Sequence, residues 1–188
     1  MKQWIDRLRK DKTLDQEVFR QLLTGCNAET LRYINQQARE VSQLHFGHRI
    51  FIRGLIEISN CCRNNCLYCG IRKGNPHVKR YRLTKESILQ CCRQGYNLGF
   101  RTFVLQGGED PAFTDERMEE TVAAIRQEFP DCAITLSVGE KPREVYERFF
   151  RAGANRYLLR HETFNEAHYQ LLHPAEMSSQ RRLQCLRD

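Results

Sequence analysis

Residues 101–129, RTFVLQGGEDPAFTDERMEETVAAIRQEF, contain a short apolar run, a glycine pair and a longer segment of mixed polarity. The apolar run at 101–106 predicts a buried strand, and the segment 114–129 predicts a helix. A strand that leads through a short turn into a helix is the repeating unit of a parallel sheet covered by helices. This stretch therefore predicts an α/β fold.

The same alternation continues on both sides of this unit. The preceding unit has an alternating, β-branched strand at 50–59, a loop rich in cysteine, and a helix at 84–99. That helix opens with Thr84 and Glu86 in an imperfect capping box, because Ser87 stands where Glu or Gln is usual. Two further units follow, with strands at 132–138 and 156–160 and helices at 141–153 and 165–173. Four strand–helix units in succession predict a parallel sheet.

The first 46 residues have a different texture. They carry apolar residues at three- and four-residue spacing, with Gly25 as a stop within them and Gly47 directly after them, and predict helices. A closed eight-stranded barrel takes about 250 residues, so four units cannot close one. The last residues, SQRRLQCLRD, look like the opening of another helix. We therefore expect a helical extension at 1–48 and, at 49–188, the first four βα units of an incomplete TIM-like barrel; an open four-stranded domain is the alternative.

Composition bounds the class of protein. The chain has 188 residues, of which 40% are hydrophobic and 28% charged, as in globular domains. It has no apolar run approaching the ~20 residues of a membrane span, and its charged start does not resemble a signal peptide. We therefore expect a cytoplasmic protein without membrane association. In that reducing compartment, clustered cysteines are better metal ligands than disulfide partners.

The net charge is +7, from 30 Lys and Arg against 23 Asp and Glu. Most of the basic residues are interspersed with acidic ones, and only residues 72–82 form a dense basic segment. A face that receives an anionic small molecule explains this segment as well as nucleic acid does, so nucleic acid is not the expected partner. A non-catalytic metal-binding module that docks a partner or RNA through this segment stays open as another class of function.

The stretch SNCCRNNCLYCG, residues 59–70, places four cysteines in nine positions. Cys62, Cys66 and Cys69 are spaced as C-x3-C-x2-C, and three thiolates at this spacing can hold one iron–sulfur cluster. A [4Fe–4S] cluster with three cysteines keeps one iron open to a small molecule. A structural zinc ion is the alternative and usually needs a fourth ligand. The candidates for that ligand are Cys61, His77, Cys91 and Cys92.

Polar side chains and glycines follow the predicted strands, at the edge where barrel enzymes carry their chemistry. Gly107, Gly108 and Glu109 follow the second strand; the glycines allow close approach of a ligand, and Glu109 can accept hydrogen bonds from an ammonium group. Further candidates at the third and fourth strand ends are Ser137, Arg160 and Glu162. An arginine there suits a carboxylate, and a glutamate suits ribose hydroxyls or a cation.

The three-cysteine motif with Tyr68 before its last cysteine, at the end of the first strand, resembles the radical S-adenosylmethionine (SAM) superfamily. The resemblance implies that Cys62, Cys66 and Cys69 hold a [4Fe–4S] cluster, with Cys61 a bystander because it is one position out of register. The free iron would be chelated by the SAM amino and carboxylate groups, and the reduced cluster would cleave SAM to a 5′-deoxyadenosyl radical. Tyr68 would lie beside the adenine, and the glycine pair with Glu109 resembles the motif that holds the SAM amino group.

Three further strings, TLSVGE, AGANRYLLRHETFNEAHYQLLHP and RRLQCL, resemble the HydE type of [FeFe]-hydrogenase maturase, a group related to biotin synthase and methylornithine synthase. The resemblance implies that Ser137, Glu162 and Arg182 contact SAM or substrate and that Arg160 lies at the same rim. It also implies radical chemistry on a small iron precursor, with ferredoxin or flavodoxin as electron donor and other hydrogenase maturases as possible partners. Family proteins continue beyond this point, so we expect the chain alone to be inactive. An enzyme similar to methylornithine synthase or to biotin synthase, with a different substrate, is the alternative.

Overall fold

The computed structural model describes residues 1–188 and divides into two units, Met1–Phe51 and Ile52–Asp188. The first unit consists of three helices. The helices are α1 (Lys2–Asp11), α2 (Gln16–Thr24) and α3 (Ala28–Phe46), and they confirm the helices predicted from the sequence. The side chain of Asn27 caps α3 by accepting a hydrogen bond from the Thr30 N–H. The Tyr33 hydroxyl donates to Asp6 at 2.6 Å and ties α3 to α1.

The second unit is built on a four-stranded parallel sheet in the order β1-β2-β3-β4. The register places Ile56 beside Leu105, Leu105 beside Leu136, and Leu136 beside Tyr157. The strands are Gly54–Ser59 (β1), Thr102–Gly107 (β2), Ala133–Ser137 (β3) and Arg156–Tyr157 (β4). This sequential order confirms the predicted α/β fold of four consecutive βα units.

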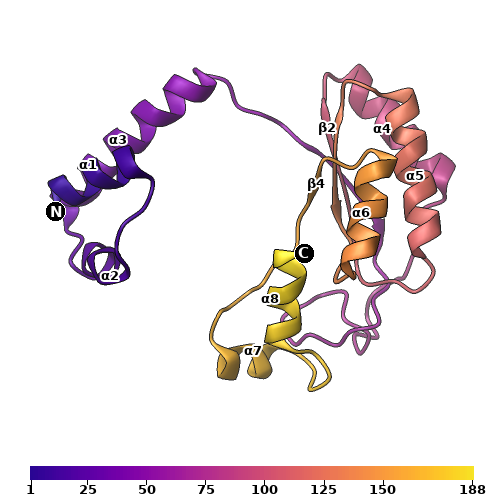
Figure 1. The fold of residues 1–188 in the computed structure, drawn as a ribbon. Coiled ribbons are helices and arrows are strands. Elements are labelled where there is room, and N and C mark those ends of the chain that lie inside the picture. Colours follow the sequence, from indigo (N-terminus) through magenta and orange to yellow (C-terminus); the bar gives the residue numbers. More distant parts are fainter. The chain divides into compact units, whose positions relative to one another are not determined.

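Helices α4 (Lys85–Asn97), α5 (Asp115–Glu128) and α6 (Arg143–Ala152) cover one side of the sheet (Figure 1). Met118, Val122 and Ile125 on α5 are fully buried against strand residues such as Phe103 and Leu105. Two shorter helices follow the last strand, α7 (Glu166–Leu172) and α8 (Ser179–Arg187). The apolar core lies between these helices and the sheet, and its burial explains why the strands are nearly continuous runs of apolar residues in the sequence.

Two strands are shorter than the sequence predicts. The run at 50–59 pairs only from Gly54, and Ile50, Phe51 and Ile52 are exposed and outside the sheet. The run at 156–160 pairs only over Arg156–Tyr157, after which the Leu158 N–H donates once more to Leu136 at 2.8 Å. Beyond that bond the chain leaves the sheet. A β-branched or apolar run predicts a strand, but the run forms one only where a neighbouring strand pairs with it.

The pleat of the sheet decides which residues face the functional site. Leu105 and Leu136 point into the helix-covered core, so the next residues along their strands, Gln106 and Ser137, point to the opposite face. Glu57 on β1 lies beside Gln106 in the register. These three side chains therefore share one face at the carboxyl ends of neighbouring strands.

Candidate functional site

The cysteine-rich loop, residues 60–83, leaves the carboxyl end of β1 and folds back on itself. The Lys73 N–H donates to the Asn64 carbonyl at 2.8 Å, and the Cys69 N–H donates to the Cys66 carbonyl at 3.1 Å. The Leu67 N–H donates at 2.9 Å to Leu172, at the end of α7. Backbone bonds on both sides thus hold the segment that carries the cysteines, and every cysteine in it is a free thiol.

One cavity of about 240 Å³ at the carboxyl ends of the strands collects the predicted site residues. All eleven of them line it, although they come from five separate stretches of sequence. They are Cys62, Cys66, Tyr68, Cys69, Gly107, Gly108, Glu109, Ser137, Arg160, Glu162 and Arg182. The fold therefore brings together every residue that the strand-end argument and the family resemblance singled out.

The thiols differ from free cysteines in their surroundings. Burial raises the pKa of the Cys62 and Cys66 thiols, and negative charge on Cys69 raises both further. Thiols in this state keep their protons until a metal displaces them, because the metal ligand is the thiolate. Burial therefore favours the protonated form of the Cys62 and Cys66 thiols.

The donor set fits a cluster better than a single metal ion. Three cysteines line the cavity, and no fourth cysteine and no histidine lines it. In an iron–sulfur cluster each cysteine binds a different iron, so the sulfurs need not meet at one point. The proposed fourth ligands of a zinc site all lie outside the cavity lining: Cys61, His77, Cys91 and Cys92. Cys92 lies on α4, and its side chain is buried in the apolar core.

Gly108 has a packing role that the sequence did not reveal. A Cβ atom at this position would lie 2.3 Å from the Cys61 carbonyl oxygen and 2.6 Å from Cys62 Cβ. Both distances are shorter than real Cβ contacts, and the first atom belongs to the backbone. The glycine therefore makes room for the cysteine loop to cross the end of β2.

Asp110 anchors the loop after β2 to the end of β1. The Arg82 guanidinium donates to its carboxylate at 2.7 Å, and the Ser59 hydroxyl donates to the same group. Burial acts to raise the pKa of Asp110, but the hydrogen bonds from Arg82 and Ser59 outweigh it and lower the pKa. The carboxylate stays ionised and holds three segments together beside the cavity.

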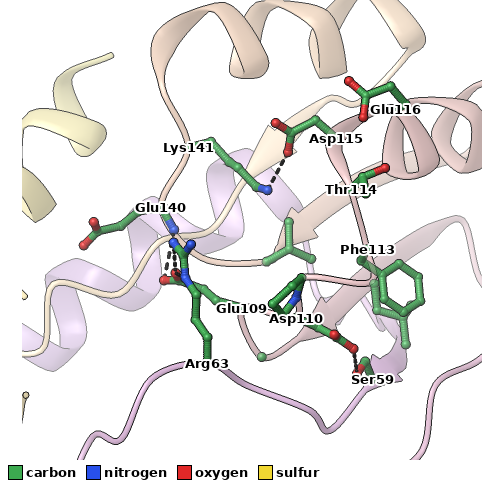
Figure 2. A pocket seen from close by; sticks show the side chains of 14 residues that line it. Ser59, Arg63, Glu109, Asp110, Phe113, Thr114, Asp115, Glu116, Glu140 and Lys141 are labelled. Carbon is green, nitrogen blue, oxygen red and sulfur yellow. Dashed lines mark hydrogen bonds and ion pairs between the residues drawn. The ribbon is translucent and has the colours of Figure 1, made fainter.

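Glu109 stands between the cysteine-lined cavity and a second cavity of about 260 Å³ (Figure 2). Arg63 approaches from the second cavity and donates to Glu109 at 2.8 Å. The Glu140 N–H donates to the other carboxylate oxygen at 3.3 Å. The two partners bind different oxygens of the Glu109 carboxylate and orient it at the boundary of the cysteine-lined cavity.

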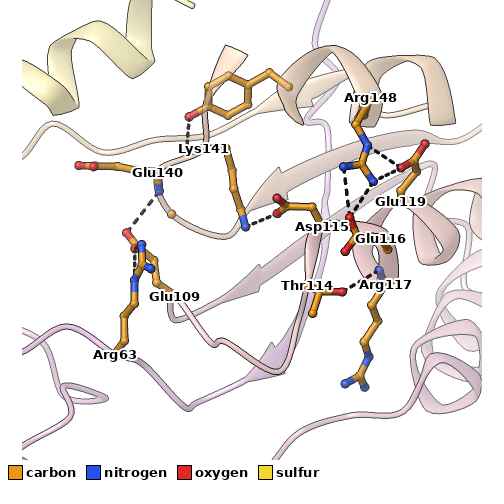
Figure 3. A network of polar contacts seen from close by, with 12 residues as sticks. Arg63, Glu109, Thr114, Asp115, Glu116, Arg117, Glu119, Glu140, Lys141 and Arg148 are labelled. Atoms are coloured by element: carbon orange, nitrogen blue, oxygen red, sulfur yellow. Dashed lines mark hydrogen bonds and ion pairs between the residues drawn. The ribbon is translucent and has the colours of Figure 1, made fainter. Parts of the chain in front are cut away.

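The charged groups that line the second cavity are paired, some with one another and some with side chains of the surrounding segments (Figures 2 and 3). The Lys141 ammonium group contacts Asp115 at 2.5 Å, and the Lys141 backbone N–H donates to the Tyr146 hydroxyl at 3.1 Å. On the neighbouring helices, Arg148 of α6 contacts Glu119 of α5 at 2.6 Å. These pairs stiffen the loop between β3 and α6, from which Glu140 reaches Glu109.

Arg182 on α8 is buried, which excludes the solvated helix position that its basic surroundings in the sequence allow. Its Nε donates to Glu140 at 2.6 Å, and its Nη1 donates to the Arg160 carbonyl at 2.6 Å. Arg160 and Glu162 form no ion pair with each other. Glu162 has a φ of 63°, a left-handed conformation that L residues adopt at a cost and that recurs at functional sites.

Removing Arg182 is expected to destabilise the second unit by about 3 kcal/mol, because the nearly buried Glu140 would lose its buried hydrogen-bond partner and keep only the mostly exposed Arg181. The test is urea unfolding of Arg182→Met followed by circular dichroism. Arg181→Met is the matched control: Arg181 contacts the same carboxylate at 3.3 Å but is mostly exposed, so its loss should cost about 0.5 kcal/mol or less. Equal destabilisation by the two substitutions would contradict a buried role for Arg182.

The structure adds two residues to the site that sequence reasoning missed. Met177 Sδ lies 3.8 Å from Cys66 Sγ, and Met177 lines the cysteine-lined cavity. His173 is buried and lies 3.0 Å from the Tyr68 hydroxyl through Nε2, while its Nδ1 lies 2.9 Å from the Tyr169 carbonyl. Since that carbonyl can only accept, Nδ1 carries the proton and Nε2 accepts from Tyr68. The sequence signal was the histidine in LLHP, but nothing local connects it to the cysteine loop.

The comparisons with known proteins agree with this geometry. A family model described as the radical SAM superfamily matches residues 56–188. The [FeFe] hydrogenase maturase subunit HydE of Thermotoga maritima is 46% identical over 149 residues, which are 79% of this chain and 42% of that protein. A 3-methylornithine synthase of Methanosarcina acetivorans is 31% identical over 161 residues, 85% of this chain and 45% of that protein.

A solved structure extends the likeness to the fold. The X-ray structure of the FeFe-hydrogenase maturase HydG from Carboxydothermus hydrogenoformans superposes with a TM-score of 0.85 at 27% identity, covering 98% of this chain and 44% of that one. The chain thus spans less than half the length of these relatives. None of its helices is both long and apolar enough to cross a membrane. From the family match, the shared fold and the three-cysteine cavity, we conclude that the chain belongs to the radical SAM superfamily, whose members use a [4Fe–4S] cluster and S-adenosylmethionine.

Proposed function

We propose that this chain is the cluster- and SAM-binding part of a radical SAM enzyme that acts in assembly of the [FeFe]-hydrogenase active site. The observation that carries the proposal is the single cavity lined by all eleven predicted site residues. The identity of 46% to a HydE maturase directs the proposal to hydrogenase maturation. When bound, the reduced cluster supplies the electron that cleaves SAM to methionine and a 5′-deoxyadenosyl radical.

Each part of the cavity has a proposed task. The thiolates of Cys62, Cys66 and Cys69 would hold the cluster. Glu109, already oriented by Arg63, accepts hydrogen bonds from the SAM ammonium group. The remaining polar residues bind the SAM carboxylate, the ribose hydroxyls or the substrate: Ser137, Arg160, Glu162 and Arg182. Tyr68 packs beside the adenine, with its ring oriented by His173.

Methylornithine synthesis is the second candidate, because a 3-methylornithine synthase is 31% identical over 85% of the chain. The SAM-binding residues serve both reactions and do not separate them. The biotin-synthase-like reading has the weaker support of 23% identity. The proposal for the maturase includes a cytoplasmic location, reduction by ferredoxin or flavodoxin, and contact with other hydrogenase maturases.

Anaerobic reconstitution with iron and sulfide tests the proposed cofactors. We expect a brown protein whose reduced form gives an EPR signal that changes when SAM is added. Glu109→Gln should retain the cluster but weaken SAM binding about tenfold or more, because a charge-assisted hydrogen bond to the ammonium group is lost. Glu116→Gln, in the second cavity and mostly exposed, is the matched control.

The outcomes separate the classes of function. A colourless protein that holds one zinc ion would overturn both the maturase and the methylornithine proposals and favour a non-catalytic metal-binding module. Unchanged SAM binding by Glu109→Gln would remove Glu109 from the SAM site without touching the cluster assignment.

A further inference from the structure

The cysteine loop is unusually basic. Residues 60–83 contain no Asp or Glu, but they contain the six cations Arg63, Arg72, Lys73, Lys79, Arg80 and Arg82. A loop of one sign beside a redox centre creates a local potential that attracts molecules of the opposite sign. The structure decides which of these charges are available for a partner.

Three of the six cations are already occupied. Arg63 pairs with Glu109, and Arg82 pairs with Asp110. Arg80 turns inward and donates to four backbone carbonyls of the loop, which makes it an internal support for the loop. Arg72, Lys73 and Lys79 form no ion pair with any carboxylate, and we refer to these three residues as the basic patch.

The basic patch is attached directly to the cysteine segment. The Arg72 N–H donates to the Cys69 carbonyl at 3.2 Å, and the Lys73 N–H donates to the Asn64 carbonyl at 2.8 Å. Leu67, which lies between two of the cluster cysteines in sequence, is 61% exposed. An exposed apolar side chain near unpaired cations on the loop of the redox centre resembles the small, charged contacts of electron-transfer complexes.

We infer that the basic patch, together with Leu67, is the docking surface for an acidic one-electron carrier protein. This inference rests on the proposed function, because it requires a cluster held by Cys62, Cys66 and Cys69. One electron passes from the reduced carrier to that cluster, so the carrier is oxidised and the cluster reduced by one electron each, and no bond forms or breaks. The surface places the carrier against the loop that holds the electron acceptor.

Two other occupants fit the basic patch less well. None of its three residues lines either cavity at the strand ends, so they are not placed to bind a small anion inside. Nucleic acid binding depends on many phosphate contacts and, for single strands, on stacked aromatic rings. The nearest exposed aromatic in the basic segment, Tyr81, is held by a hydrogen bond from its hydroxyl to the Glu57 carbonyl. A brief contact with an acidic protein needs neither feature.

Charge reversal on the patch tests the inference in the reconstituted chain. Lys73→Glu/Lys79→Glu changes two exposed side chains that make no hydrogen bond. Mixed anaerobically with a fully reduced acidic flavodoxin, this variant should show cluster bleaching that is slower by about tenfold or more at low ionic strength, because steering is reversed. The difference should shrink at about 0.5 M salt, where exposed charges are screened. Reduction by photoreduced deazariboflavin, which needs no docking surface, should keep its rate.

The matched control is Arg151→Glu/Arg156→Glu, which changes the net charge by the same amount. Arg151 lies in the last turn of α6 and Arg156 begins β4, so both lie at the amino ends of the strands, opposite the cysteine loop. The inference is overturned if both double variants slow the flavodoxin reaction equally, or if neither does. The inference is also overturned if Lys73→Glu/Lys79→Glu slows reduction by deazariboflavin as much as it slows reduction by flavodoxin. A third contrary result is that this variant loses binding of a labelled single-stranded RNA while its reduction by flavodoxin is unchanged.

A neutral pair of substitutions guards against a folding defect. Lys73→Gln/Lys79→Gln should give an intermediate rate with flavodoxin and a shallower dependence on salt than the unmodified chain. A chain that binds no cluster would refute the proposed function before any rate is measured. A cluster-bearing chain with salt-independent flavodoxin reduction would instead refute only the docking surface.

Discussion

Replacing Cys62 with alanine is expected to abolish cluster binding. Cys62, Cys66 and Cys69 are the only thiols that line the cavity, so the loss of one leaves two ligands for a centre that needs three. Iron and sulfide per chain, together with the visible absorbance after anaerobic reconstitution, measure the effect. Cys66→Ala and Cys69→Ala should give the same loss, because no other cysteine can take their place.

Cys61→Ala is the matched control and should leave the cluster content nearly unchanged. The Cys61 thiol lies 3.8 Å from the Tyr81 carbonyl and outside the cavity lining, although it is adjacent to Cys62 in sequence. If Cys61→Ala abolished the cluster and Cys62→Ala retained it, the register of the motif would be wrong by one residue.

Replacing Gly108 with alanine is expected to have the second large effect. The added Cβ would overlap the Cys61 carbonyl and Cys62 Cβ, so the backbone of the cysteine loop would have to move. We expect a loss of about 3 kcal/mol in the free energy of unfolding, as for overpacking that displaces backbone. Because the backbone of the cysteine loop would move, we also expect the cysteines to lose the arrangement that binds the cluster. Urea unfolding and cluster content after reconstitution measure the two effects.

Gly70→Ala provides the comparison within the same loop. Gly70 follows the last cluster cysteine, has no heavy atom within 4 Å of its would-be Cβ, and does not have a positive φ. Its substitution should change stability by about 0.5 kcal/mol or less and leave cluster content intact. If Gly108→Ala behaved like Gly70→Ala, the close crossing of the two loops would not be a constraint on the fold.

Most of the predicted helices and strands are found in the structure, because each was predicted from a local pattern of apolar residues. Helices α4, α5 and α6 and strands β2 and β3 lie where the periodicity placed them, since each pattern encodes one buried face. The strands at 50–59 and 156–160 were overextended for the same reason: their apolar residues match a strand, but only part of each run has a neighbour to pair with. Pairing depends on residues far away in the chain, and the local pattern does not contain it.

The site residues divide in the same way. The spacing of Cys62, Cys66 and Cys69 is a local property, and the amino-acid sequence alone was enough to select them and reject Cys61. The residues after each strand could be selected because parallel strands bring their carboxyl ends to one edge. Neither argument requires knowledge of how side chains from different units meet.

Only the tertiary structure decided how these residues are supported. Arg182 is held by Glu140, 42 positions away, and Tyr68 by His173, 105 positions away. Gly108 has a required packing role because the cysteine loop crosses directly over it. By itself the sequence determined the order of strands and helices along the chain and the spacing of the ligands, since both are local patterns within the chain. The pairing of charges and the close approach of backbones were decided by the fold, since they arise only when distant segments are brought into register.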